Sequence, residues 1–533
     1  MSKNEGIIFT RNASGLVREL SWFDVFVFVV AGPAASGVVY FSVSTAADYP
    51  GANLPLAFLL GLALFAPICL LVALTSATMP RSGGLYVAVS RVLGPTMGFL
   101  SAWLLFIGNG IGSGALGYIV VGMVGAACST AAISSEIAWL ASVGHMLQTT
   151  LAQIIGGVIW LIGFWAIALY GIRKIKILMR IAFVIPMVAT IIAVVWFFFA
   201  GDISSVAESF NATWGAGAFE AIKTKAAELA AVDGFNMSPD FSMTATMNAF
   251  LVVIWAYASI TIVNYASGEV KTPKNSLIRG FMIGTFFVGI FYVVIVFAAY
   301  NAFGDFIMHY DYMFDNHPEQ LAAILGAESA VEPSVPFYFM AIAGNVWFGL
   351  LIAVSIALWF ANSILPGFLA NSRVAFALSM DKSLPKAFSD VDRRTGSPRN
   401  AVHLYALFML LGVFVMSLSV QEILGILTVT LFFIFWPYGL ATMLLPYHKP
   451  EIYERSPVKW EIFGIPLFSI LGMFTFLVGW FFIYLSLKDF SMSTAITLFA
   501  IMGIGMAIYA AKQNQNKKEG VDVDKIYSLV PPE

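Results

Sequence analysis

Long apolar runs recur through this sequence, and each is long enough to cross a lipid bilayer as a helix. A spanning helix needs about 20 apolar residues, because it rises about 1.5 Å per residue through about 30 Å of hydrocarbon. Only 11% of the residues are charged, against about 25% in soluble domains. The sequence therefore predicts an all-α polytopic membrane protein. We place its twelve transmembrane helices at 23–43, 54–79, 97–128, 151–170, 177–200, 247–267, 281–303, 346–370, 401–419, 423–445, 462–487 and 494–511.

The basic residues are distributed unevenly between the two sides of this predicted topology. Twelve spans place both termini on one side, and 25 of the 28 Lys and Arg residues fall there. The remaining three are Lys223, Lys225 and Lys488. Loops that stay in the cytoplasm are enriched in Lys and Arg. We therefore predict a multi-pass protein of the cytoplasmic membrane with its N- and C-termini in the cytoplasm.

The titratable residues argue against several other classes of function. A net charge of −2 gives no support for binding nucleic acid. Cys69 and Cys128 have neither disulfide nor metal-ligand spacing, and the five histidines form no cluster with other reactive side chains. We therefore expect no enzyme, no metal and no cofactor. The expected partners are the lipid bilayer and a small-molecule substrate, and a monomer and a homodimer both remain open.

Two of the predicted spans, the first and the sixth, are interrupted near the middle. In the first, Pro33 lacks an N–H, and Gly32 and Gly37 flank it, which disfavours a continuous helix. The sixth gives a weaker signal, because its Ala256–Ser259 run contains neither Gly nor Pro. Interruptions at matching places in two halves indicate the binding site of a secondary transporter. The alternative is that Gly32 and Pro33 only kink the first helix.

An offset of five spans inverts the direction in which the two interrupted segments cross the membrane. The N-terminus of a half-helix presents free N–H groups and a positive dipole, so the N–H groups of Ala35, Ser36 and Gly37 suit a carboxylate. An interruption around Ala256–Ser259, which includes Ala258, would free carbonyl groups that suit an ammonium group. Together these groups predict a site for an α-amino acid near the middle of the bilayer.

Three motifs follow the second, sixth and eighth predicted spans. They are Pro80-Arg-Ser-Gly-Gly-Leu-Tyr86, Gly268-Glu-Val-Lys-Thr-Pro-Lys-Asn275 and Asn371-Ser-Arg-Val-Ala-Phe-Ala-Leu-Ser-Met-Asp-Lys-Ser-Leu-Pro385. Together they resemble the amino acid–polyamine–organocation (APC) superfamily of permeases, over residues 20–511. The resemblance implies a leucine-transporter-type core of two inverted five-helix repeats, with discontinuous first and sixth helices. These repeats would be residues 21–200 and 244–447, with a cytoplasmic segment at 1–20, an extracellular loop at 201–243, two accessory helices at 461–511 and a cytoplasmic tail at 512–533.

The resemblance also assigns individual residues to the substrate site. The Ala35-Ser-Gly37 run is similar to the family's carboxylate-binding loop, with Ala in place of its first Gly. Trp255 matches an aromatic gate, and with Tyr257 it would cover the bound substrate. Ser259 stands where a Gly is usual. Asn109 matches a residue that faces substrate in relatives, and the alternative for this buried amide is a hydrogen bond between helices.

The coupling ion is open between sodium and protons. A sodium ion would need neutral oxygens, which the eighth span offers at Ser355, Asn362 and Ser363, and the first span at the carbonyls of Ala31 and Ala34. Some proton-coupled relatives place a Lys on the fifth span, but residues 181–199 contain none. Exchange of one amino acid for another, without an ion, is the alternative to both.

Two acidic residues at span ends and several loops have simpler interpretations. We expect Asp24 to cap the first helix after Ser21, and Glu269 to form a structural ion pair. We interpret the long loops 201–242 and 304–334 as solvated connections, with a surface helix at 219–232 and a lid helix at 336–345 as alternatives. The polar tail after residue 511 is expected to be disordered.

The predicted function is secondary active transport of a neutral amino acid by alternating access, driven by a proton or sodium gradient. A neutral substrate is expected because no acidic side chain is evident in the predicted site. The alternatives within the same fold are an amino acid exchanger and a transporter of a polyamine or another organic cation. A membrane sensor that binds its ligand without moving it is the alternative from another class.

Overall fold

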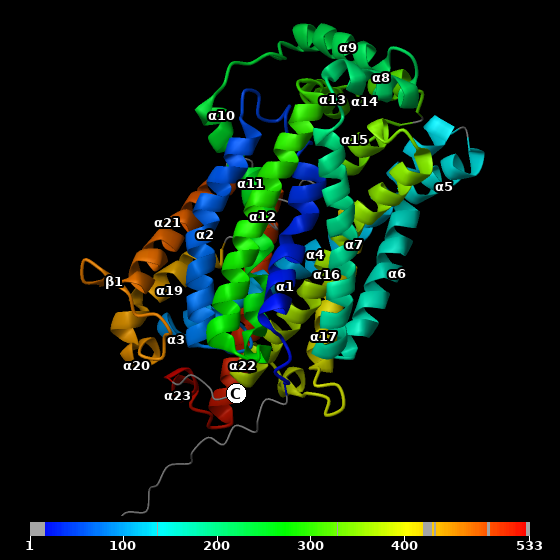
Figure 1. The fold of residues 1–533 in the computed structure, drawn as a ribbon. Coiled ribbons are helices and arrows are strands. Elements are labelled where there is room, and N and C mark those ends of the chain that lie inside the picture. The colour runs from blue at the N-terminus through cyan, green and yellow to red at the C-terminus, as the bar shows by residue number, and fades with distance from the viewer. Residues whose placement is uncertain are drawn as a thin grey trace, which may run out of the picture.

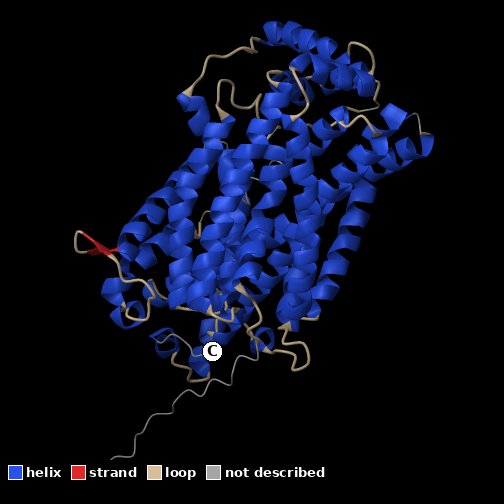
Figure 2. Ribbon diagram, in the orientation of Figure 1, coloured by secondary structure: helices blue, strands red, loops and turns tan. Residues whose placement is uncertain are grey.

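The protein folds as one bundle of roughly parallel helices, seen here in a computed structural model (Figure 1). The structure describes residues 16–135, 137–327, 329–418, 429–430, 433–487 and 491–528. Short helices cover one end of the bundle, and the chain ends at the other, which we call the C-terminal face (Figure 1). Within these residues the chain is almost entirely helical, apart from one small hairpin at the side of the bundle (Figure 2).

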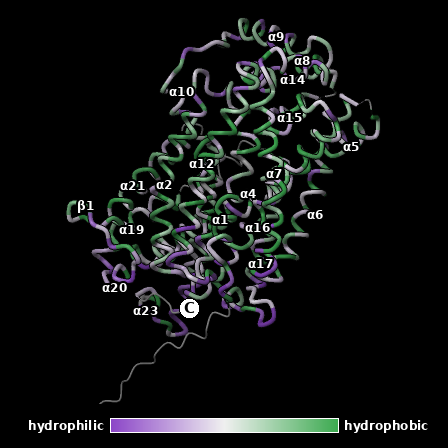
Figure 3. The backbone as a smooth tube through the Cα atoms, in the orientation of Figure 1, coloured by the Kyte–Doolittle hydropathy of each residue, from purple (hydrophilic) through white to green (hydrophobic). Residues whose placement is uncertain are grey.

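Ten helices of the described chain are long and apolar enough to cross a membrane. They confirm ten of the predicted spans, and their hydrophobic residues lie along the middle of the bundle (Figure 3). They are α2 (Leu54–Thr78), α4 (Pro95–Ser135), α6 (Thr150–Leu169), α7 (Ile172–Phe198), the run of α10 (Met243–Asn248), α11 (Phe250–Ala258) and η2 (Ser259–Glu269), α12 (Pro273–Phe303), α16 (Val346–Met380), α17 (Arg399–Met416), α21 (Leu467–Leu487) and α22 (Met492–Lys518).

The other two predicted spans have different counterparts. The first corresponds to α1 (Trp22–Ala34) together with the segment η1 (Ala35–Phe41). The tenth was predicted at 423–445, and α19 (Phe435–His448) covers its second half. The first half of that prediction lies mostly outside the described residues.

Helix α1 runs through Pro33 to Ala34, so the interruption predicted in the first span takes the form of a change of helix type and not of an unwound segment. Pro33 lies inside α1, and from Ala35 the chain continues as a π-helix. A proline removes one backbone donor and crowds the carbonyl four residues earlier, and the wider π turn provides a different hydrogen-bond register. The sixth span changes from α-helix to 3-10 helix at Ser259, inside the predicted interruption, and Ala266 within η2 has non-helical dihedrals.

Shorter elements connect these helices or cover their ends. Figure 1 places α8, α9, α13 and α14 over the end opposite the C-terminus. The short elements are α3 (Leu85–Val92), α5 (Ala138–Gln148), α8 (Ile203–Trp214), α9 (Ala218–Asp233), α13 (Phe306–Asn316), α14 (Pro318–Leu325), α15 (Val335–Ile342), η3 (Lys386–Ser389), α20 (Pro450–Tyr453), α23 (Val523–Ser528) and the antiparallel strands β1 (Glu461–Ile462) and β2 (Ile465–Pro466).

These short helices correct the interpretation of both long loops as solvated connections. Helix α9 confirms the alternative of a surface helix at 219–232, and α15 covers much of the proposed lid helix. Helix α13 buries Tyr310, Asp311 and Met313, so residues 304–334 form part of the packed structure. The apolar residues in these two long loops are too few in each short helix to give a clear helical period in the sequence.

A buried ion pair ties the end of the sixth span to α16. Arg373 donates from Nε to Oε1 of Glu269 at 2.6 Å and from Nη2 to Oε2 at 3.1 Å, and neither side chain is exposed. The backbone N–H groups of Glu19 and Leu20 donate to the Glu269 carbonyl at 2.8 and 2.9 Å. The predicted structural ion pair of Glu269 is therefore confirmed, and it also fixes the chain that enters α1.

The first helix begins as predicted, with a reciprocal cap. The Ser21 N–H donates to Oδ2 of Asp24 at 2.8 Å, and the Asp24 N–H donates to the Ser21 hydroxyl at 3.3 Å. Arg180 of α7 also donates to Oδ1 of Asp24 at 2.7 Å. The capping role of Asp24 is confirmed, and the contact with Arg180 joins α1 to α7.

The tail is ordered where it packs against the C-terminal face, so the prediction of disorder after residue 511 is wrong for residues 512–528. Helix α22 continues to Lys518, and Asn516 donates to the Lys382 carbonyl at 2.8 Å. Tyr527 of α23 is buried, with its hydroxyl 2.8 Å from that of Ser383. Its ring lies beside Arg91, which pairs with Asp381. A short polar sequence does not reveal a docking site made by distant residues.

The buried pair of Glu269 and Arg373 makes a prediction about stability. Glu269→Gln leaves the Arg373 charge buried without its counter-charge, which typically costs about 3–5 kcal/mol. We expect a clear fall in the midpoint of thermal unfolding of the purified protein in detergent. Glu454→Gln removes one partner of the exposed pair with Lys459 and should change stability by less than about 1 kcal/mol. Equal shifts in the unfolding midpoint for both variants would show that the buried pair stabilises the protein no more than the exposed pair does.

Candidate functional site

The first and sixth spans touch where each changes its helix type. A side chain built at Gly32 would place its Cβ 2.9 Å from the carbonyl oxygen of Ser259 and 3.4 Å from Cγ2 of Ile262. Only the absence of a side chain allows this approach. Gly32 precedes the π-helix by three residues, and Ser259 is the first residue of the 3-10 helix. The two interruptions predicted from sequence therefore meet in space.

Tyr292 of α12 connects the same two segments on another side. A Cβ at Gly37 would overlap the Tyr292 ring, so the ring packs directly on the backbone of η1. The Tyr292 hydroxyl donates to the Ala256 carbonyl of α11 at 2.9 Å. The carbonyl predicted to be free for an ammonium group at Ala256 is thus occupied by a tyrosine in this structure.

Sequence reasoning missed Tyr292, which lies in the middle of an apolar span. A signal was present, because a tyrosine hydroxyl inside a membrane helix must find a partner and therefore marks a contact. Nothing in the sequence indicates that this partner is the sixth span.

The structure orients Trp255 and Tyr257 differently. Trp255 is half-buried on α11. Tyr257 is fully buried, donates from its hydroxyl to the Phe58 carbonyl at 2.9 Å and stacks on Phe65 at 5.4 Å between ring centroids. Both of these partners belong to α2, so the Tyr257 side chain packs against that helix. Its predicted place over a bound substrate is not supported by this orientation.

Three predicted site residues can be located only by their backbone. Ala35 and Ser36 begin the π-helix η1, and Ala258 ends α11. The side chains of these three residues lie outside the described part of the structure. The assignment of Ala35, Ser36 and Gly37 to a carboxylate therefore stays a prediction, based on their N–H groups.

Asn109 lies on α4 and faces α16. Its Nδ2 donates to Oδ1 of Asn371 at 3.4 Å, and its carbonyl accepts from the Tyr405 hydroxyl at 2.9 Å. These contacts join three helices. They support the alternative of a hydrogen bond between helices, and contact with substrate stays a prediction for Asn109.

Two of the five residues proposed for a sodium ion are in direct contact. The Ser363 hydroxyl of α16 donates to the Ala31 carbonyl of α1 at 2.8 Å and to the Trp359 carbonyl of its own helix at 3.0 Å. Ala34, the last residue of α1, is buried. The eighth and first spans therefore present oxygens to one another next to the π-helix.

The remaining two candidates for the sodium site, Asn362 and Ser355 on α16, differ in their hydrogen bonding. Asn362 is 1% exposed, and neither its side-chain oxygen nor its nitrogen has a hydrogen-bond partner in the described structure. Ser355 donates to the Leu351 carbonyl of its own helix at 2.7 Å. It lies about 12 Å along the helix axis from Ser363, so it does not join the same group.

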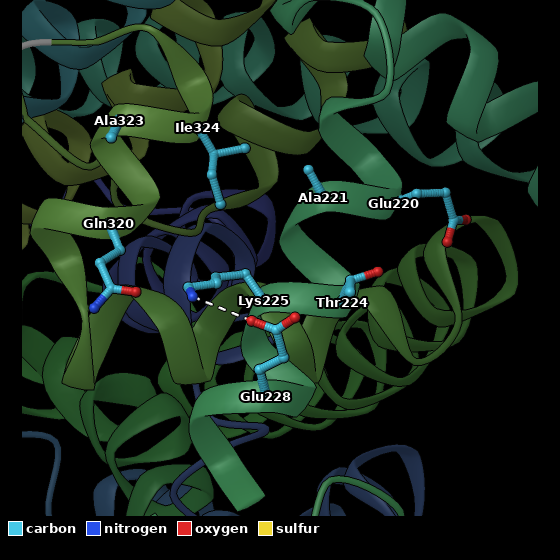
Figure 4. Close-up of a pocket in the computed structure, with 8 residues that line it drawn as sticks. All are labelled: Glu220, Ala221, Thr224, Lys225, Glu228, Gln320, Ala323 and Ile324. Carbon is cyan, nitrogen blue, oxygen red and sulfur yellow. Dashed lines mark hydrogen bonds and ion pairs between the residues drawn. The ribbon is translucent and has the colours of Figure 1, made fainter. Parts of the chain in front are cut away.

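A hollow of about 610 Å³ opens elsewhere, between α9 and α14 (Figure 4). Glu220, Lys225 and Glu228 line it from α9 and Gln320 from α14, and Lys225 pairs with Glu228 at 3.1 Å (Figure 4). No predicted site residue lines this hollow. Among the described residues no three His, Cys, Asp or Glu side chains are grouped to hold a metal ion.

Comparison with known proteins identifies a family that matches this sequence. A family described as "Amino acid permease" matches residues 20–507. Cadaverine/lysine antiporters of Escherichia coli strains K12, O6:H1 and O157:H7 are each 21% identical over 452 residues. The matched region covers 83% of this chain and 84% of each relative.

The contact of Gly37 with Tyr292 predicts the effect of a larger side chain. Gly37→Leu should reduce substrate uptake into proteoliposomes by about fivefold or more, because forcing a side chain into the space filled by Tyr292 typically costs about 1–3 kcal/mol. The matched control is Gly163→Leu on α6, where nothing lies within 4 Å of the added Cβ. Both variants are compared at equal amounts of monodisperse protein. Normal uptake by Gly37→Leu would refute the assignment of this segment to the substrate site.

Proposed function

The chain belongs to the amino acid permease family of the APC superfamily and is therefore a transporter, and from this premise we propose that it moves an amino acid across the cytoplasmic membrane by alternating access. We assign it twelve transmembrane helices, ten of them in two inverted repeats. Both termini are assigned to the cytoplasm, because 25 of the 28 basic residues then lie on that side.

The contact between Gly32 and the Ser259 carbonyl is the observation that carries this proposal. Helices of transporters are interrupted where their backbone groups bind substrate or ions, at the interface of the two repeats. Local π and 3-10 segments change the backbone hydrogen-bond register and are frequent at functional sites and hinges. Because the π-helix of the first span and the 3-10 helix of the sixth span touch each other, their contact offers a place for substrate and a place where the helices can bend.

The nature of the contact residues supports a zwitterionic substrate. Gly32, Ser259, Thr261 and Ser363 carry no charge. Backbone N–H and carbonyl groups can bind the carboxylate and ammonium groups that every α-amino acid shares. A neutral amino acid is therefore our first candidate.

Uptake of radiolabelled substrates into proteoliposomes tests this function. The twenty amino acids and a set of polyamines are compared under a proton gradient, a sodium gradient, or with unlabelled substrate preloaded inside. We expect accumulation of at least one neutral amino acid in response to one gradient. Absence of flux for every amino acid, in protein that is folded and inserted, would contradict the proposal. Binding without flux would identify a sensor instead.

Exchange is the second candidate, and the relatives favour it. The E. coli proteins are named cadaverine/lysine antiporters. An exchanger would move substrate only into preloaded vesicles, whether or not an ion gradient is applied. If a diamine exchanged for an amino acid in these preloaded vesicles, we would conclude that the substrate is cationic and not neutral.

Sodium coupling makes a residue-specific prediction. The hydroxyl of Ser363 and the Ala31 carbonyl are the neutral oxygens that we assign to a sodium ion. Ser363→Ala should raise the sodium concentration for half-maximal uptake by about tenfold or more. Ser355→Ala is the matched control, because its hydroxyl bonds only its own helix, and it should leave that concentration unchanged. Uptake that is independent of sodium in the unmodified protein would remove the sodium assignment.

A further inference from the structure

The two short strands of the described chain form a tight hairpin directly before α21. Ile462 of β1 pairs with Ile465 of β2. Phe463 and Gly464 therefore make up the whole turn, and both have a positive φ, 54° and 77°. A two-residue turn with this backbone strongly favours Asn or Asp followed by Gly. A phenylalanine in the first position is unfavourable, because a bulky side chain tolerates a positive φ poorly.

The turn holds this phenylalanine away from the rest of the protein. Phe463 is 100% exposed, although its ring is one of the largest apolar groups in the chain. A fully exposed ring gains no packing within the fold that would offset its unfavourable backbone conformation. A contact outside the chain gives a physical reason for an apolar ring in this position.

The two faces of the hairpin differ in polarity. Residues that pair across two strands share a face, and so do residues two apart along one strand. Ile462 and Ile465 therefore lie on one face with Trp460, whose carbonyl accepts from the Leu467 N–H at 2.8 Å. Trp460 is 67% exposed, and each isoleucine is nearly half exposed. Glu461 lies on the opposite face, so the hairpin has one apolar face and an apolar tip.

The hairpin adjoins a helix that faces lipid. Strand β2 ends at Pro466 and α21 begins at the next residue, so the two elements have no linker between them. Helix α21 is long and apolar enough to cross a membrane. Its large exposed side chains recur every three or four residues along one stripe: Met473, Leu477, Trp480, Tyr484 and Leu487. The hairpin projects from the side of the bundle where this helix begins (Figure 1).

The charges next to the hairpin are balanced. Residues 449–461 carry three basic and three acidic side chains, namely Lys449, Arg455, Lys459, Glu451, Glu454 and Glu461. Lys459 forms an ion pair with Glu454. Attraction to anionic lipid depends on a local excess of Lys and Arg. This segment has no such excess, so its apolar side chains are the groups through which it can bind a membrane.

We propose that the hairpin 460–467 is an interfacial anchor, which inserts Phe463 and its apolar face into the bilayer where the headgroups meet the acyl chains. Interfacial segments place their apolar face about 5–10 Å into this boundary. Tryptophan is enriched at the same level, which suits Trp460 at the base of the hairpin. The anchor would fix the depth at which α21 enters the membrane, whichever substrate the transporter moves.

Spin labels on single introduced cysteines test this placement in the full-length protein, in phosphatidylcholine nanodiscs. Ile462→Cys reports the apolar face and Glu461→Cys the opposite face. Collision of each label with oxygen, which concentrates in hydrocarbon, is compared with collision with a water-soluble nickel chelate. Leu477→Cys on α21 is the lipid reference, and Ala387→Cys, at an exposed position of η3, is the aqueous reference. Both native cysteines are buried.

We expect the label at residue 462 to lie about 5–10 Å into the headgroup–acyl boundary, and the label at residue 461 to remain accessible to the nickel chelate. Adding phosphatidylglycerol should not change this depth, because the local charges are balanced. A residue 462 label as accessible to nickel as the aqueous reference would overturn the inference, and so would insertion that requires phosphatidylglycerol. Exclusion of both reagents would overturn it in favour of packing against protein, including a second copy of this chain.

Two substitutions at Phe463 separate its apolar contact from its backbone conformation. Phe463→Asn should preserve the hairpin, because Asn suits this turn position, while it removes the apolar ring. Phe463→Trp is the matched control, because it keeps an aromatic ring that favours the interface. We expect the label at residue 462 to move into the aqueous phase in Phe463→Asn and to keep its depth in Phe463→Trp. Equal depth in the unmodified protein and Phe463→Asn would overturn the role of the tip as an anchor.

Discussion

The lipid bilayer offers no water to backbone groups, so every N–H and carbonyl of a spanning segment must find a partner within the protein. This requirement determines how the first and sixth spans can be interrupted. A fully unwound segment would leave several groups unpaired, whereas π and 3-10 helices keep the chain hydrogen-bonded in a shifted register. Pro33 makes such a shift necessary in α1, and the missing side chain of Gly32 lets the Ser259 carbonyl approach it. This contact is where the backbones of the first and sixth spans both depart from regular α-helix.

Charged side chains are paired differently at the two ends of the bundle. At the C-terminal face, Arg373 pairs with Glu269 and Arg91 with Asp381, and all four side chains are buried. Removing one member of such a pair is costly, so the Glu269–Arg373 pair holds the end of η2 against α16. The C-terminal face is therefore held by buried ion pairs, whereas the pairs at the opposite end, Lys223 with Asp305 and His317 with Asp233, are partly exposed.

The sequence predicts the helices well and their contacts poorly. Hydrophobic length alone located ten spans, because a membrane helix needs about 20 apolar residues whatever its neighbours are. The interruption near Gly32 was predictable from Pro33, but its π geometry was not, because that depends on how the surrounding helices satisfy the freed carbonyl. The sequence analysis proposed Ser363 and Ala31 for the same ion site, and the two residues are in contact. It did not predict that the Tyr257 side chain would face α2. The packing of a helix within a long loop, such as α13, depends on partners that are distant in the sequence. No local pattern identifies those partners.

The neutral substrate predicted from sequence is compatible with a site made of backbone groups. Backbone groups near Gly32 and Ser259 can recognise only the carboxylate and ammonium that all α-amino acids share, so they discriminate weakly between side chains. Selection between amino acids then has to come from side chains and not from these backbone groups. A site that binds through its backbone therefore suits a class of amino acids better than a single member of that class.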